Sequence, residues 1–69
     1  MTKAEAQKAV DAAFADTLGG EYRNLLNAVF SEKPTAETTE HAFRKALALN
    51  IAAHAIASRA IADNPDLKD

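Results

Sequence analysis

Residues 35–63, TAETTEHAFRKALALNIAAHAIASRAIAD, decide the fold of this chain. The stretch contains neither glycine nor proline, and it is rich in alanine, the residue with the highest helix propensity. The first breaker is Asp63-Asn64-Pro65. The stretch therefore predicts one long helix of about 27 residues, which is roughly 40 Å at 1.5 Å per residue.

The predicted long helix carries two apolar stripes, found by placing its residues at steps of about 100°. The first stripe consists of Phe43, Leu47, Asn50, His54, Ala57 and Ile61. The second stripe consists of Ala42, Ala46, Leu49, Ala53, Ile56 and Ala60. Together with Ile51 on the other flank they cover roughly 220°, whereas one packed face needs about 100°. We therefore expect this helix to pack against the rest of the chain on one side and against another copy on the other.

The first half of the chain predicts two shorter helices. Thr2 and Glu5 have the spacing of a capping box, which starts a helix over residues 3–18. Its apolar stripe is Ala6, Val10, Ala13, Phe14 and Leu18. Gly19-Gly20 predicts the end of this helix, because a glycine in the left-handed backbone conformation commonly follows the last helical residue. A helix over residues 21–31 follows, and the break at residues 31–35 is attributed to Pro34.

The helix predicted over residues 21–31 carries its own core-facing stripe. The stripe has the spacing i, i+3, i+4, i+7, i+8 and consists of Tyr22, Leu25, Leu26, Val29 and Phe30. The sequence thus predicts an all-α, three-helix chain that forms one domain over residues 1–69, with a short tail at 64–69.

The length of the chain favours assembly into a helical-bundle oligomer. Sixty-nine residues with 48% hydrophobic and 26% charged side chains are typical of one small folded domain. A core this small commonly needs oligomerisation to be stable. We expect the second stripe to form the contact. The alternative is a monomer whose exposed alanines only raise helix propensity.

Charge and composition exclude several classes of function. The net charge is −2, and both halves of the chain hold 4 basic and 5 acidic residues, so no polyanion partner is indicated. Cysteine is absent, which excludes a disulfide framework and thiolate chemistry. The start, MTKAEAQK, lacks the apolar segment of a signal peptide, and the longest uncharged stretch, 46–58, falls short of the about 20 residues of a membrane span. We expect a cytoplasmic protein without a membrane partner.

His54 and Asn50 are the strongest candidates for a functional site in this sequence. One interpretation is a pair of buried polar groups that sets helix register, as a buried Asn does in coiled coils. The other is a ligand site in an oligomer core, where a neutral imidazole binds a metal, haem iron or a proton. The structural interpretation is favoured. His41 lies about 20 Å away along the helix, so it cannot join His54 at a metal within one chain. No nucleophile motif or phosphate loop is present. We therefore predict no enzyme, no metal and no cofactor.

A helix-turn-helix DNA-binding protein is a further alternative. The helix over residues 21–31, a short turn and the start of the long helix have the right order. Residues that could face a groove are Thr38, Thr39, His41, Arg44 and Lys45. Glu37 and Glu40 would lie beside the phosphates, and the pI of about 5.6 opposes DNA binding. Nucleic acid is therefore not the favoured partner.

The favoured function is a small non-catalytic protein-interaction module (an adaptor, inhibitor or regulator) that acts as a helical homo-oligomer. Its partners are itself and another protein. Tyrosine and arginine dominate interface energetics, which makes four residues candidates for facing the second partner. They are Tyr22, Arg23, Arg44 and Arg59. The first alternative is a small-ligand binder that uses His54 and Asn50.

Overall fold

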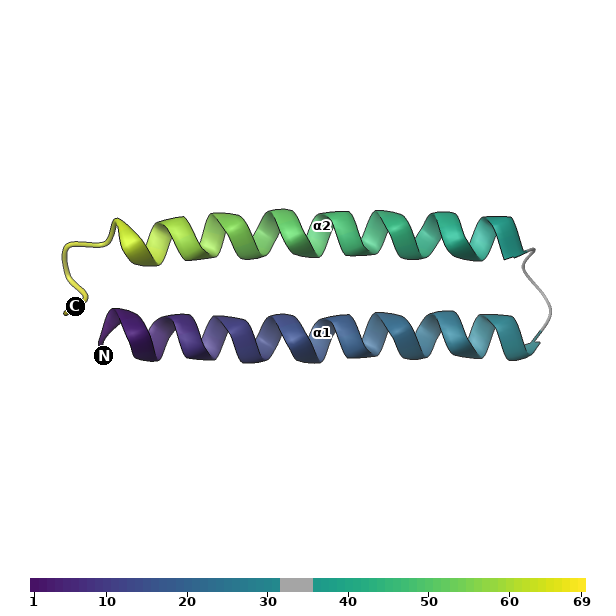
Figure 1. The fold of residues 1–69 in the computed structure, drawn as a ribbon, viewed down its shortest axis with the longest axis horizontal. Helices are drawn as coiled ribbons and strands as arrows, with labels where there is room; N and C mark the ends of the chain where they lie inside the picture. Colours follow the sequence, from purple (N-terminus) through teal and green to yellow (C-terminus); the bar gives the residue numbers. More distant parts are fainter. Residues whose placement is uncertain (32–35) are drawn as a thin grey trace.

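The chain forms a hairpin of two long antiparallel helices (Figure 1). The computed structural model describes the backbone of residues 1–31 and 36–69, and their side chains except those of 36–38. Helix α1 runs over Lys3–Ser31 and helix α2 over Ala36–Ala62. The hairpin measures 49 × 15 × 9 Å, and the two termini lie at the same end (Figure 1).

The all-α class is confirmed, but the three-helix chain is wrong. Helix α1 continues through Gly19 and Gly20, where the sequence predicts an end. Each glycine inside a helix costs only about 1 kcal/mol relative to alanine, and neither glycine takes the left-handed conformation of a helix end. Packing along α2 on both sides of the glycines offsets this cost. Because the chain has two helices, the prediction of a bundle of three-helix subunits is wrong as well.

At the open end of the hairpin, the start of α1 and the end of α2 are both capped. The capping box is confirmed: the Glu5 amide donates to Thr2 Oγ1 at 3.1 Å, and the Thr2 amide donates to Glu5 Oε1 at 3.0 Å. The Lys3 ammonium donates to the carbonyl of Ala62 at 2.9 Å, at the end of α2. It also lies 3.2 Å from a carboxylate oxygen of Asp69. A cation is favourable at this negative end of the helix dipole.

The long predicted helix corresponds to α2, and its first stripe turns toward α1. Every member of that stripe is half-buried: Phe43, Leu47, Asn50, His54, Ala57 and Ile61. The break predicted at residues 31–35 lies, apart from Ser31, outside the described residues.

The core stripe predicted over residues 21–31 is wrong. Only Leu25 is half-buried, whereas Tyr22, Val29 and Phe30 are exposed by 56%, 58% and 76%, and Leu26 is exposed as well. Because α1 is one continuous helix, its rotation is set along its whole length. Residues at seven-residue spacing, such as Phe14 and its continuation at Glu21, face α2 and turn the Tyr22 side outward.

The described part of the hairpin has no closed hydrophobic core. Among the described residues no hydrophobic side chain is buried, and the one buried residue is Thr39. The chain exposes 5367 Å², whereas a globular monomer of 7.4 kDa exposes about 4,200 Å². The excess of about 1,200 Å² is larger than the roughly 800 Å² that each partner buries in a standard interface.

Candidate interaction surface

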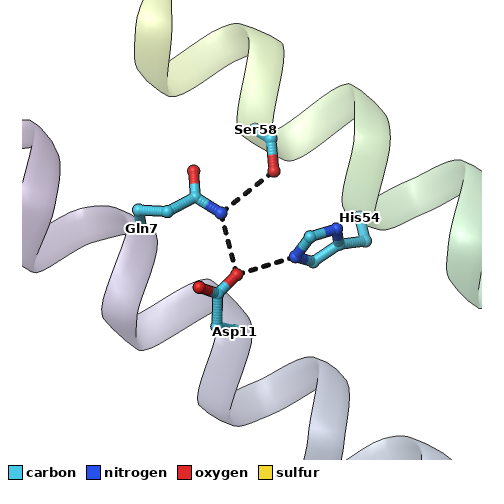
Figure 2. Close-up of polar contacts among 4 residues, drawn as sticks. All are labelled: Gln7, Asp11, His54 and Ser58. Carbon is cyan, nitrogen blue, oxygen red and sulfur yellow. Dashed lines mark hydrogen bonds and ion pairs between the residues drawn. The ribbon is translucent and has the colours of Figure 1, made fainter.

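A polar network joins α1 to α2 near the open end of the hairpin (Figure 2). Nε2 of His54 lies 2.7 Å from Oδ1 of Asp11. The amide nitrogen of Gln7 donates to the same Asp11 oxygen at 2.8 Å and to Oγ of Ser58 at 3.0 Å. The His54 ring also contacts Phe14, with the ring centroids 4.7 Å apart. Polar and aromatic contacts therefore hold the helices in register here.

Asp11 is held in its ionised form by this network. The hydrogen bond from His54 lowers the pKa of the Asp11 carboxyl below its ordinary value, and the hydrogen bond from Gln7 lowers it further. Both donors favour the charged carboxylate over the neutral acid. The Asp11 carboxylate thus accepts hydrogen bonds from a side chain of α1 and from a side chain of α2.

A second polar contact joins the helices nearer the loop. Nδ2 of Asn50 donates to Oε1 of Glu21. The other carboxylate oxygen, Oε2, is buried and has no hydrogen-bond partner among the described residues. An unpaired buried carboxylate oxygen is costly, because it has lost water and gained no donor.

The structure brings Asn50 and His54 to the same face of α2, where each bonds to a carboxylate of α1 in the same chain. The sequence analysis predicted neither of these carboxylates, because each contact joins residues that are far apart along the chain. One signal was present: Gln7, Phe14 and Glu21 recur at seven-residue intervals, which is the spacing of a helix–helix seam.

Two shallow grooves run between the helices. The loop-end groove holds about 280 Å³ and is lined by Glu21, Asn24, Leu25, Ala28, Thr39, Ala42, Phe43 and Ala46. The open-end groove holds about 220 Å³ and is lined by Val10, Ala13, Phe14, Thr17, Asn50, Ala53, His54 and Ala57. Three members of the predicted second stripe of α2 border these grooves, so the grooves and the stripe belong to one side of the hairpin.

We call this side the grooved face. It consists of Ala13, Thr17 and Asn24 of α1 with Ala42, Ala46, Leu49, Ala53, Ile56 and Ala60 of α2. None of these residues is charged. Leu49 and Ile56 are exposed by 63% and 61%, and of the α2 members only Ala46 is half-buried. Most of the predicted interface stripe therefore lies uncovered in the single chain.

The four candidate partner-facing residues are all exposed. Tyr22 belongs to the apolar side of α1 that the hairpin leaves open. The Arg23 guanidinium donates to the Gly19 carbonyl at 3.4 Å, and that of Arg44 pairs with Glu40 at 2.8 Å. Arg59 lies in the last turn of α2.

The residues considered for DNA binding do not form a helix-turn-helix. That motif places its helices at about 90–120°, whereas α1 and α2 lie antiparallel along their lengths (Figure 1). His41 and Lys45 are exposed, Thr39 is buried, and Arg44 is paired with Glu40. The side chains of Glu37 and Thr38 lie outside the described part of the chain.

Two further findings concern the described residues alone. No group of three or more His, Asp and Glu side chains gathers there in a way that could hold a metal ion. Neither α1 nor α2, as described, combines the length and the apolar character needed to cross a membrane.

Comparison with family models, with curated proteins and with solved structures finds no match to this chain.

Proposed function

We propose that this chain is a small non-catalytic protein-interaction module, an adaptor, inhibitor or regulator, that acts as a helical homo-oligomer. A second copy of the chain covers the grooved face. The observation that carries this proposal is the excess exposed area of about 1,200 Å² on a hairpin in which no described hydrophobic residue is buried. Such a hairpin gains little free energy from hydrophobic burial until a partner covers it.

The chemistry of the grooved face favours a second copy as the occupant. In a two-fold dimer the same patch of both subunits meets, so a charge near the two-fold axis would lie beside its own like charge. The residues that make up the grooved face are uncharged, and Glu21, the charged residue that lines the loop-end groove, is half-buried and bonded to Asn50. The alanines of the grooved face let another helix approach closely, and Leu49 and Ile56 supply large side chains to bury.

Three matched variants test this assignment. Leu49→Glu and Ile56→Glu place a charge on the grooved face, while Ile51→Glu places one on the other flank of α2 at a similar exposure of 53%. We expect the first two to shift the molar mass in light scattering toward the monomer, and Ile51→Glu to keep the mass of the wild type. Equal masses for all three variants would contradict the assignment.

The second protein partner and the cytoplasmic location stay predictions from the sequence. The open apolar side of α1 around Tyr22 is the surface we assign to that second partner. The small-ligand alternative, which uses His54 and Asn50, stays a prediction as well; both residues line the open-end groove.

A further inference from the structure

We propose that the contact between Glu21 and Asn50 sets the rotation of α1 about its own axis and keeps Tyr22 and Val29 out of the seam between the helices. The proposal concerns the two helices of one chain. It therefore goes beyond the proposed function and does not depend on self-association.

Most large apolar residues around Glu21 lie to one side of it. At steps of about 100°, four of them fall roughly 40–100° from Glu21 in the same direction: Leu18, Tyr22, Leu25 and Val29. Tyr22 and Val29 are exposed by 56% and 58%, whereas Glu21 is half-buried. A turn of α1 in that direction would cover more apolar surface, so hydrophobic burial alone favours it.

Glu21 faces α2 at a cost in free energy. Its Oε1 accepts the hydrogen bond from Asn50 Nδ2, while its Oε2 is buried and has no hydrogen-bond partner among the described residues. A polar contact in a helix seam can specify one arrangement of the helices at the expense of stability, as a buried Asn does in coiled coils. We assign this role to the Glu21–Asn50 contact.

The polar network at the open end of the hairpin tolerates the turn. Asp11 lies eleven residues before Tyr22, which is about three full turns, so both residues are on the same side of α1. The turn would carry Asp11 toward α2 and keep it near His54. It would carry Glu21 away from Asn50, so the Glu21–Asn50 contact opposes it.

Tyr22 makes the rotation of α1 measurable. It is the one tyrosine of the chain, and tryptophan is absent, so the intrinsic fluorescence of the protein reports the exposure of this side chain. Asn50→Leu removes the donor to Glu21. We expect it to lower the acrylamide quenching constant of this fluorescence roughly twofold, because an exposed tyrosine becomes largely buried.

Three further variants complete the test. Glu21→Ala removes the other partner of the contact and should lower the quenching constant similarly; it decides the test if circular dichroism shows that Asn50→Leu has lost its helices. Asn50→Gln keeps an amide donor and should keep the wild-type constant. Ala52→Leu adds a leucine at an exposed position of α2 and should keep it too.

Light scattering at the same concentration separates this proposal from the proposed function. Asn50→Leu should keep the wild-type molar mass, whether that is the mass of one chain or of two, because Tyr22 is not part of the grooved face. A higher mass together with lower quenching would overturn the proposal, since a new contact between copies would then cover Tyr22.

Two other results would overturn the proposal. One is a wild-type quenching constant in either Asn50→Leu or Glu21→Ala with the helices intact, since α1 would then keep its rotation without the contact. The other is an equally lowered constant in Ala52→Leu, since added bulk on α2 would then be the cause.

Discussion

Nε2 of His54 and Oδ1 of Asp11 lie 2.7 Å apart and connect α2 to α1 at the open end of the hairpin. The hydrogen bond from His54 lowers the pKa of Asp11. A carboxyl group whose folded-state pKa is lowered stabilises the fold above its unfolded pKa of about 3.9. This contribution is lost as the pH falls through the folded-state value.

We therefore expect acid to destabilise the hairpin partly through Asp11. Asp11→Asn should lower the melting temperature at neutral pH and should flatten its fall between neutral and acidic pH, since the titrating group is gone. Asp16→Asn is the matched control and should keep the wild-type slope. Thermal melts followed by circular dichroism across this pH range measure the effect, and identical slopes for Asp11→Asn and the wild type would contradict it.

The continuity of α1 leads to a prediction at Gly19. A Cβ added there would meet Arg23 Nη2 at 3.6 Å, an ordinary contact, so Gly19→Ala should stabilise the fold by about 1 kcal/mol. If Gly19 instead ended a helix in the left-handed conformation, the same change would destabilise the protein. Chemical denaturation of the variant distinguishes the two cases by the sign of the change.

The rotation of α1 predicts losses of stability of different size at two phenylalanines. Phe14 is half-buried against His54, whereas Phe30 is exposed by 76%. Phe14→Ala should lower the free energy of unfolding by about 2 kcal/mol, and Phe30→Ala by less than about 0.5 kcal/mol. A larger loss from Phe30→Ala, measured by denaturation, would show that the Tyr22 side of α1 is covered in solution.

The capping box predicts a further loss at the start of α1. Thr2→Ala removes the side-chain acceptor for the Glu5 amide and should cost about 1 kcal/mol. Glu5→Gln keeps an acceptor for the Thr2 amide and should cost much less. Equal losses from the two variants in thermal melts would contradict this account, because Glu5→Gln keeps both hydrogen bonds of the box.

The periodicity of the sequence predicted α2 and the side of it that faces α1, because apolar spacing over 27 residues is a strong local signal. Local sequence patterns could not predict that α1 continues through Gly19 and Gly20. A glycine pair ends a helix or continues it depending on its backbone conformation, and here the packing of α1 on α2 decides. The roles of Asp11 and Glu21 depend on their distance to His54 and Asn50, which are 43 and 29 residues away along the chain.

Self-association through the grooved face is the central claim, and the molar mass of the unmodified chain in solution tests it most directly. Light scattering after size exclusion, repeated over a range of concentrations, should give about twice the chain mass of 7.4 kDa or more. A helical monomer of 7.4 kDa that unfolds cooperatively at every concentration would contradict the claim.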